Sequence, residues 1–355
     1  MKKDVYVDPD IKKTYRVFPA QNRYDKIRLD MNENPEGLPE DFVESVLKEV
    51  TPQFLSVYPE PDRFLKKYAD FVGVSFENVL ATNGSDMGIR YILETFGEKG
   101  KDIVTVTPSF EMYWVNCSIL GYNHVAVPYN EDLTIDIGRV VDAITEDTRV
   151  VVLLNPNNPV GNVYTEEEAK AVIDRAEEVG AVVVIDEAYH YFYPKTFLSF
   201  AMERENVIIL RTFSKLLSLA ACRLGVMISH PDIIHYVKNA RLTFDANSIA
   251  LLFAERLLER PDVIDALIQT EREGRDYLLA ELGKRGYACK DCHGNYVLME
   301  PKTDPKELAK RLEEKHRVLI HTFGNELLKK YLRISTGSKK AMDLFLAALD
   351  EEDEA

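Results

Sequence analysis

The sequence predicts an α/β protein with one large domain and a smaller α+β companion. Its 355 residues exceed the size at which a single hydrophobic core stops growing, so we expect two domains with a cleft between them. Between about residues 80 and 230, short continuous apolar runs alternate with amphipathic segments, which is typical of a parallel sheet covered by helices on both faces. After about residue 260, helical and strand-like segments alternate over a shorter stretch.

Six runs rich in Val and Ile are expected to form the buried strands of the larger domain. They span residues 102–107, 124–129, 149–155, 181–186, 207–211 and 224–229. Residues 165–179 carry apolar side chains at helical spacing with charges opposite, and Thr165 followed by Glu168 matches a capping box. That segment predicts a helix crossing between two strands.

The remaining segments predict the smaller domain. Its expected helices span residues 263–285, 305–315 and 339–349, and its expected strands span residues 296–300, 318–321 and 331–335. The acidic run that starts at Asp350 is interpreted as a tail in solvent.

Composition narrows the class of protein. A formal charge of −15 disfavours a general nucleic-acid binder, because phosphate contacts require clustered Lys and Arg. No apolar run approaches the ~20 residues that span a bilayer, and the N-terminus shows no secretory signal. We therefore expect a cytoplasmic protein without membrane segments.

The four cysteines are expected to be free thiols. Cys289-Lys-Asp-Cys292-His293 also matches redox and haem-attachment motifs. The motif runs into a predicted turn and strand, however, and no second pair of metal ligands lies nearby in the sequence. We therefore expect neither a metal nor a haem.

One polar segment predicts an anion site. Gly84, Ser85 and Asp86 precede a helical run, and amides and hydroxyls at a helix N-terminus form a natural phosphate cradle. An ordinary helix cap is the alternative. Arg223 adds a guanidinium, and Thr212 and Ser214 add hydroxyls, which together suit a phosphate dianion.

Lys215 follows the predicted strand 207–211, at the end where α/β sheets place their ligands. A surface lysine is the alternative, but the preceding Arg211-Thr-Phe-Ser is not typical of a solvated face. Burial beside other cations lowers the pKa of a lysine and makes its amine nucleophilic. Lys215 is therefore a candidate for forming a Schiff base and for moving a proton.

Asp186 closes a buried apolar run, where a carboxylate is either a helix cap or functional. Opposite a pyridine nitrogen, it would keep that nitrogen protonated, so that the ring withdraws electrons from a substrate carbanion. Tyr189 and the amide of Asn158 are candidates to bind the phenolic oxygen of such a ring, although Asn158 also lies in a turn-forming sequence. Together these residues indicate pyridoxal 5′-phosphate (PLP).

The ordered motifs resemble those of the fold-type I PLP aminotransferases. They are Asn83-Gly-Ser-Asp86, Pro108-Ser-Phe110, Asn158-Pro-Val-Gly161, Asp186-Glu-Ala-Tyr189, Thr212-Phe-Ser-Lys215 with Arg223, and Arg333-Ile-Ser-Thr-Gly337. They cover nearly the whole chain. Within that superfamily, Leu29-Asp-Met-Asn32-Glu-Asn-Pro35 and Tyr58-Pro-Glu-Pro61 resemble the histidinol-phosphate aminotransferase branch.

The resemblance implies the fold of aspartate aminotransferase. A large PLP-binding domain with a mostly parallel seven-stranded sheet would span residues 45–258. A small α+β domain would combine residues 1–44, which include an N-terminal arm, with residues 259–355. The resemblance also implies a homodimer with shared active sites.

Several residue roles follow from the resemblance alone. Phe110 would stack on the pyridine ring where the family usually has Tyr, and Tyr58 would reach the cofactor phosphate of a neighbouring subunit. Ser85 and Asp86 would meet the phosphate through their backbone amides. Arg333 would bind a carboxylate or phosphate of the substrate.

Three further residues depart from the family pattern. His321 stands where members specific for histidinol phosphate typically carry an arginine, and it would bind a phosphate less firmly and in a pH-dependent way. Met87 replaces an acidic residue and Val160 replaces a threonine. These changes leave the cofactor residues intact but bear on the substrate, for which Asn32 and His321 join Arg333 as candidate contacts.

The expected reaction is ping-pong transamination with glutamate and 2-oxoglutarate and a partner like histidinol phosphate. A PLP decarboxylase of a phosphorylated amino acid, such as threonine-phosphate decarboxylase, resembles the same branch and stays open as an alternative. A nicotinamide dehydrogenase is disfavoured because no Gly-x-Gly-x-x-Gly follows the early strands. A PLP-sensing transcription regulator would need a basic DNA-binding module, for which residues 1–30 are too few.

Overall fold

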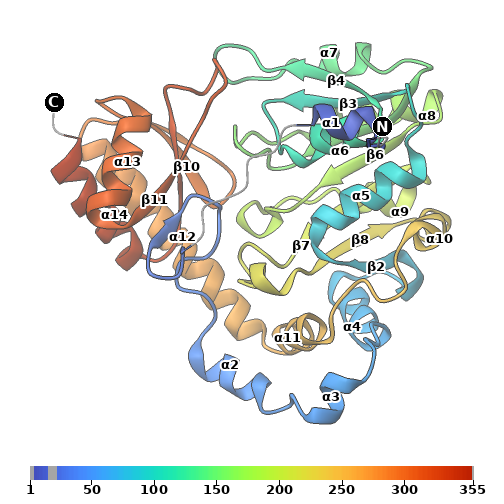
Figure 1. Cartoon of the computed structure of the whole chain (residues 1–355), viewed down its shortest axis with the longest axis horizontal. Helices are drawn as coiled ribbons and strands as arrows, with labels where there is room; N and C mark the ends of the chain where they lie inside the picture. The colour runs from blue at the N-terminus through green and yellow to red at the C-terminus, as the bar shows by residue number, and fades with distance from the viewer. Residues whose placement is uncertain (1–3, 15–21, 354–355) are drawn as a thin grey trace.

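A computed structural model describes residues 4–14 and 22–353. Two sheets organise the chain, a larger one of seven strands and a smaller one of five (Figure 1). The larger sheet is formed by the middle of the chain, and the smaller sheet joins a strand from the N-terminal region to four strands from the C-terminal region.

The larger sheet has the strand order β2-β8-β7-β6-β5-β3-β4. Its strands are β2 (Val79–Thr82), β3 (Asp102–Thr107), β4 (Asn123–Pro128), β5 (Thr148–Leu154), β6 (Val182–Asp186), β7 (Val207–Thr212) and β8 (Gly225–Ser229). The pairs from β4 to β7 are parallel, whereas β8 is antiparallel to both β7 and β2. The predicted mostly parallel seven-stranded sheet is therefore confirmed.

Both faces of this sheet are buried, which explains the continuous apolar runs. In β6, Val183 and Ile185 pack in one hydrophobic cluster, and the alternate residues Val182 and Val184 pack in another on the opposite face. One cluster includes side chains of α4 (Asp62–Val72), α8 (Glu166–Glu178), α9 (Leu198–Glu203) and α11 (Ser248–Leu258). The other includes side chains of α5 (Gly84–Phe96), α6 (Met112–Leu120) and α10 (Pro231–Ala240). The sheet is thus the middle layer of three.

The helices around the larger sheet follow the predicted alternation. They are α4 (Asp62–Val72), α5 (Gly84–Phe96), α6 (Met112–Leu120), α7 (Ile137–Asp142), α8 (Glu166–Glu178), α9 (Leu198–Glu203), α10 (Pro231–Ala240) and α11 (Ser248–Leu258). α8 begins at the predicted capping box, in which the Thr165 hydroxyl accepts from the Glu168 amide and the Glu168 carboxylate accepts from the Thr165 amide.

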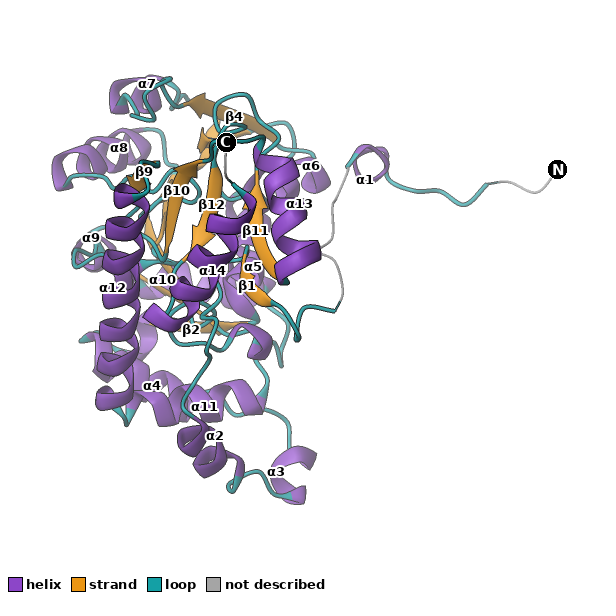
Figure 2. Ribbon diagram, turned by 90° about the vertical axis from the view of Figure 1, so that its left-hand side faces the viewer, coloured by secondary structure: helices purple, strands orange, loops and turns teal. Residues whose placement is uncertain are grey.

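The smaller sheet has the strand order β1-β11-β12-β10-β9. Its strands are β1 (Ile27–Leu29), β9 (Ala288–Asp291), β10 (Tyr296–Glu300), β11 (Val318–Thr322) and β12 (Leu332–Ser335). Its helices are α12 (Pro261–Lys284), α13 (Pro305–His316) and α14 (Lys339–Glu352). In Figure 2 these helices stand in front of the strands, where their apolar side chains share one cluster with the sheet.

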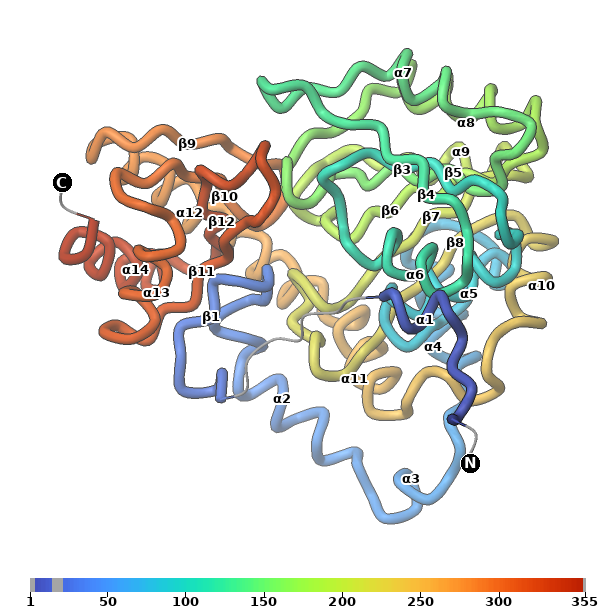
Figure 3. The backbone as a smooth tube through the Cα atoms, turned by 45° about the horizontal axis from the view of Figure 1, so that its top comes forward, coloured from blue at the N-terminus to red at the C-terminus, as the bar shows by residue number. Residues whose placement is uncertain are grey.

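Three short helices belong to the N-terminal region. They are α1 (Pro9–Lys13), α2 (Glu40–Leu47) and α3 (Pro52–Ser56). α1 lies beside α6 (Figure 3), and just after it the hydroxyls of Thr14 and Ser118 lie 2.8 Å apart. Among the described helices, none combines the length and the apolar character that a membrane span requires.

The interpretation of the acidic C-terminal run as a solvated tail is wrong for Asp353, whereas Asp350 and Glu351 are exposed but belong to α14. Asp350 pairs with Arg285 at 2.7 Å, and Asp353 is buried and accepts hydrogen bonds from the backbone amides of Lys302 and Thr303, both at 3.0 Å. The acidic residues therefore attach the end of α14 to the smaller sheet's own loops. Residues 354 and 355 lie outside the described part.

The expectation of free thiols is confirmed for all four cysteines. Cys292 is fully buried, and its Cβ would lie 2.3 Å from a Cβ placed on Gly161, so the two backbones pack closely. Within residues 4–14 and 22–353, no cluster of three or more potential metal ligands occurs.

Candidate active site

A cavity of about 100 Å³ lies at the carboxyl ends of β5, β6 and β7. Ten of the twelve residues that the sequence suggested for cofactor binding line it. They are Ser85, Asp86, Phe110, Asn158, Asp186, Tyr189, Thr212, Ser214, Lys215 and Arg223. Parallel strands that end at one edge bring these distant motifs together, as ligand sites of α/β sheets require.

Lys215 lies in the loop after β7 and is half-buried. Its Nζ donates a hydrogen bond to the backbone oxygen of Met31 at 3.0 Å and lies 5.8 Å from the centre of the Tyr189 ring. The amine is thus held by a neutral carbonyl and an aromatic face, with no carboxylate bonded to it among the described residues. This environment leaves it available to react with a carbonyl group in the cavity.

Asp186 ends β6 and is 2% exposed. One carboxylate oxygen accepts from the Tyr113 hydroxyl at 2.8 Å, and the other accepts from the Ala188 amide at 3.1 Å. Burial raises the pKa of Asp186 to about 7, against the two hydrogen bonds that lower it. A buried carboxyl with such a pKa is suited to sharing a proton with a basic nitrogen.

Tyr113 is a member of this site that the sequence analysis missed. It lies in α6, one helical turn after Phe110, and burial together with the neighbouring Asp186 raises its pKa well above the usual value. Its hydroxyl therefore stays protonated and donates to Asp186. Tyr113 follows Phe110 by three residues, and this spacing was a weak signal that the two side chains lie on the same side of the chain.

The N-terminus of α5 presents its first amides at the cavity. Asn83 occupies the N-cap position, but its side chain does not cap the helix. Its backbone amide and side-chain amide instead donate to Asp245, at 2.8 and 3.1 Å. Because the first amides of a helix have no partner within it, those of residues 84–86 remain suited to an anion. The interpretation as an ordinary side-chain cap is not supported.

Arg223 stands over this helix end. Its Nη2 donates to the Asp86 carboxylate at 2.8 Å, and its Nη1 donates to the Ser214 hydroxyl at 3.4 Å. Gly84 has a φ of +73°, and a Cβ there would lie 2.6 Å from Arg223 Nη2, so only glycine leaves the guanidinium in place. Thr212 donates to Ser214 at 3.0 Å, which orients the second hydroxyl.

Arg333 reaches the same region from the smaller sheet. It is 6% exposed, and its guanidinium donates to the Asn158 side-chain oxygen at 2.7 Å and to the Asp30 backbone oxygen at 2.5 Å. Its Nε has no hydrogen-bond partner among the described residues, and burial lowers its pKa. A buried guanidinium without a carboxylate partner is suited to an anionic ligand.

His321 pairs with Arg333 across β11 and β12. Its ring centre lies 4.9 Å from that of Phe323, and burial, aided by the charge of Arg333, lowers its pKa to about 3. The imidazole is therefore neutral at physiological pH. The pH-dependent charge that the sequence led us to expect at His321 is absent in that range.

Asn32 connects the two sheets rather than lining the cavity. It is fully buried, and its side-chain amide donates to the Tyr189 hydroxyl at 2.9 Å. Its backbone amide donates to the Ser335 hydroxyl at 2.8 Å, and its backbone oxygen accepts from the Asn295 side chain at 3.0 Å. These bonds connect Tyr189 to β12, the strand that carries Arg333, a candidate contact of the substrate.

A buried ion pair lies directly behind the cavity. Glu187 follows Asp186, is fully buried, and accepts from Nε and Nη2 of Arg211 at 3.0 and 2.8 Å. Thr196 and the Phe197 amide also donate to Glu187, at 2.8 and 2.7 Å. This network fixes the loop after β6 against β7, and the sequence analysis did not identify it.

Tyr58 does not join the cavity of its own chain. It lies between α3 and α4, is 71% exposed, and stacks on Phe244 with ring centres 4.2 Å apart. Gly84, the other suggested residue that does not line the cavity, acts through its contact with Arg223 instead.

The site's groups fit PLP by their chemistry. An amine and a buried carboxyl line one cavity. A guanidinium, two hydroxyls and a helix N-terminus meet beside Gly84, where an added Cβ would collide with the guanidinium. These are the groups that an aldehyde, a pyridine nitrogen and a phosphate would require.

Comparisons with known proteins identify the class. Residues 24–349 match the family described as aminotransferase class I and II. The chain belongs to this family, whose members are PLP-dependent enzymes, and it is therefore a PLP-dependent aminotransferase. The cofactor expected from the sequence is confirmed.

Named relatives extend over nearly the whole chain. The histidinol-phosphate aminotransferases of Clostridium novyi (strain NT) and Caldanaerobacter subterraneus subsp. tengcongensis are 31% and 32% identical, covering 92% and 96% of both chains in each comparison. The solved histidinol-phosphate aminotransferase of Sinorhizobium meliloti, in complex with pyridoxal-5′-phosphate, shares the fold with a TM-score of 0.89 over 98% of both chains at 24% identity. The predicted aspartate aminotransferase-like fold and the resemblance to the histidinol-phosphate branch are both confirmed.

Proposed function

We propose that this aminotransferase exchanges an amino group between glutamate or 2-oxoglutarate and histidinol phosphate or a closely similar amine, by a ping-pong mechanism. The observation that carries the proposal is the approach of Arg333 from the smaller sheet to Asn158, which lines the cavity of Lys215 and Asp186. A reactive amine and an anion-binding group thereby share one site. The names of the curated relatives support the choice of substrate.

PLP, when bound, supplies a ring that takes up the electrons of a substrate carbanion. Lys215 would hold the cofactor's aldehyde carbon through Nζ and, once released by an incoming amine, would move a proton to or from the substrate. Asp186 would hold the ring nitrogen protonated, and Tyr113 would fix the carboxylate by its hydrogen bond. Tyr189 and Asn158 would bind the ring's phenolic oxygen, and Phe110 would cover its face.

The phosphate end has its own set of groups. Arg223, Ser214, Thr212 and the amides of residues 84–86 would bind the cofactor phosphate. The pair with Asp86 holds the Arg223 guanidinium at the helix end before the phosphate arrives. These roles account for the polar residues at the phosphate end of the cavity.

The substrate end carries one cation. Arg333 would bind the carboxylate of glutamate or the anionic end of the second substrate, and Asn158 orients it. His321 is neutral and would contribute a hydrogen bond rather than charge. Asn32 would act through Tyr189 as a positioning residue.

The proposal is tested by recording the absorbance of the PLP-loaded protein while glutamate or histidinol phosphate is added separately, with no keto acceptor present. Conversion of the bound cofactor to its pyridoxamine form by both amines is expected, and Lys215→Ala should abolish it. If glutamate converts the cofactor and histidinol phosphate does not, the proposed substrate is wrong. Release of carbon dioxide from a phosphorylated amino acid, with no pyridoxamine form, would favour the decarboxylase alternative.

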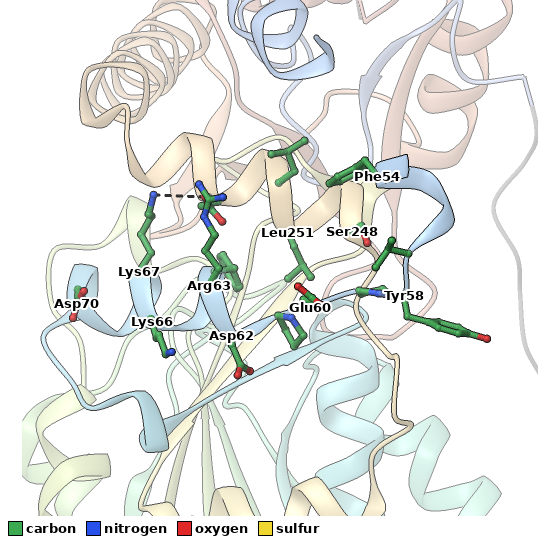
Figure 4. Close-up of a pocket in the computed structure, with 16 residues that line it drawn as sticks. Phe54, Tyr58, Glu60, Asp62, Arg63, Lys66, Lys67, Asp70, Ser248 and Leu251 are labelled. Carbon is green, nitrogen blue, oxygen red and sulfur yellow. Dashed lines mark ion pairs between the residues drawn. The ribbon is translucent and has the colours of Figure 1, made fainter. Parts of the chain in front are cut away.

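We also propose that the enzyme works as a homodimer with shared active sites. An exposed apolar surface surrounds α3, formed by Leu55, Val57, Tyr58, Phe244 and Ile249. It borders a groove of about 1010 Å³ between α4 and α11, and Figure 4 shows Tyr58 pointing away from the other labelled side chains there. A second copy covering this surface would bury it and allow Tyr58 to reach the partner's cofactor phosphate.

The dimer is tested by light scattering of wild type and of Val57→Asp. A dimer for the wild type and a monomer for the variant are expected, and a monomeric wild type at micromolar concentration would contradict the proposal.

Residues 45–258 are proposed as the PLP-binding domain, and residues 1–44 with 259–355 as the small domain, which agrees with the division of the strands between the two sheets. A cytoplasmic location is proposed as well.

A further inference from the structure

A second cavity lies where the N-terminal loop, α12 and the loop after β12 meet. Its volume is about 330 Å³, within the range of small-molecule sites. Its apolar walls include Leu38, Phe192, Leu216 and Val263. It is separate from the cofactor cavity, because the two share no lining residue.

An unpaired acceptor lies in the wall of this cavity. Asn295 lines the cavity and is 2% exposed, and its side-chain oxygen has no hydrogen-bond partner among the described residues. Its side-chain nitrogen donates to the Asn32 backbone oxygen at 3.0 Å, and this bond fixes which end of the amide is the free oxygen. A buried acceptor without a partner costs on the order of 1–3 kcal/mol, which a donor on a ligand would recover.

Two carboxyl groups line the same cavity. Glu271 is 8% exposed and accepts from the Thr336 hydroxyl at 2.5 Å, and burial raises its pKa. Glu36 accepts from the Ser338 hydroxyl at the cavity's rim. Among the described residues that line the cavity, none carries a positive charge. The polar groups therefore offer hydrogen-bond acceptors and negative charge, in contrast to the cationic substrate site.

We propose that this cavity is a binding site for a compact organic amine, with an apolar body between Leu38, Phe192 and Val263 and a protonated nitrogen at Asn295 and Glu271. An anion is disfavoured by the carboxyl groups, and an uncharged hydrocarbon would leave the Asn295 oxygen unpaired. The ionised form of Glu271 would gain a charged donor from the bound ammonium group, in addition to the Thr336 hydroxyl. This site does not depend on the identity of the transamination substrate.

A bound amine would contact segments that carry residues of the active site. Leu216 is the neighbour of Lys215, and Thr336 follows the β12 strand that carries Arg333. Asn295 holds Asn32, which in turn holds Tyr189. An occupant would therefore contact both the Lys215 loop and the segment after the strand of Arg333, which makes this a regulatory position.

The test uses 4-fluoro-N,N-dimethylbenzylamine with the PLP-loaded enzyme, because a tertiary amine cannot condense with the cofactor's aldehyde. Binding is followed by fluorine NMR. 4-Fluorophenylacetate serves as the anionic probe of similar shape. Ala266→Phe fills the cavity from the exposed side of α12, and Gln269→Phe places the same side chain on that helix outside the cavity. Glu271→Gln removes the charge.

Saturable binding of the amine is expected, weakened at least about tenfold by Ala266→Phe and by Glu271→Gln and unchanged by Gln269→Phe, with no binding of the phenylacetate. No saturable binding to wild type, equal binding to Ala266→Phe, or equal binding of the anion would each overturn the proposal. Absorbance of the bound cofactor, recorded in the same samples with glutamate, reports separately on the proposed function, so the two proposals fail independently.

Discussion

Asp186 makes a quantitative prediction about the cofactor-free protein. Burial raises the pKa of its carboxyl from 3.8 to about 7, so the folded state holds a proton that the unfolded state loses near pH 4. This group's contribution to stability is present below the unfolded pKa and is lost as the pH rises through the folded pKa. The full loss is on the order of 4 kcal/mol, of which about 2 kcal/mol falls between about pH 5 and 7.

The assay is urea unfolding of the cofactor-free wild type and of Asp186→Asn across this pH range. The variant keeps an acceptor for the Tyr113 hydroxyl but cannot ionise, so it should become more stable than wild type as the pH rises. Asp265→Asn, on the exposed side of α12, controls for the loss of one carboxylate. Parallel curves for wild type and Asp186→Asn would refute the assignment of a raised pKa to Asp186.

Three further predictions concern single side chains. Arg333→Lys keeps a positive charge but loses the planar pair of donors. The kcat/KM for glutamate should therefore fall by about 100-fold in steady-state assays, and an unchanged value would show that Arg333 does not bind the substrate. Glu187→Gln breaks the buried pair with Arg211 and should lower the free energy of unfolding by about 3–5 kcal/mol, whereas a loss below about 1 kcal/mol would show that Arg211 finds another partner. Gly84→Ala is strained at φ +73° and crowds Arg223, so the PLP dissociation constant measured by fluorescence should rise by about tenfold or more, and unaltered affinity would contradict the cradle.

The site was largely predictable because its residues follow buried strands. Asp186 and Lys215 end or follow adjacent parallel strands, and strand ends are visible in the sequence as the points where Val and Ile runs stop. Tyr113 was not predictable in this way. Its contact with Asp186 joins residues 73 positions apart, and it depends on how α6 packs on the sheet.

The error in the C-terminal run and the absence of β1 from the predicted strands have a common cause. The run after Asp350 is acidic, but charge alone does not reveal that Arg285 and the Lys302 and Thr303 amides lie beside it. The short strand β1 pairs with β11 although the sequence shows no strand pattern of its own there. Both features are determined by partners that are distant in the sequence.

The pairing of β1 with β11 also constrains how the protein matures during synthesis. Asn32 binds Ser335, which is 303 positions further along, so the first strand of the smaller sheet leaves the ribosome long before its neighbours exist. The larger sheet, whose strands are all made between residues 79 and 229, can assemble in the meantime. The Lys215 loop would then form before β12 is made, and a nascent chain would gain a complete substrate site only after Arg333 has been translated.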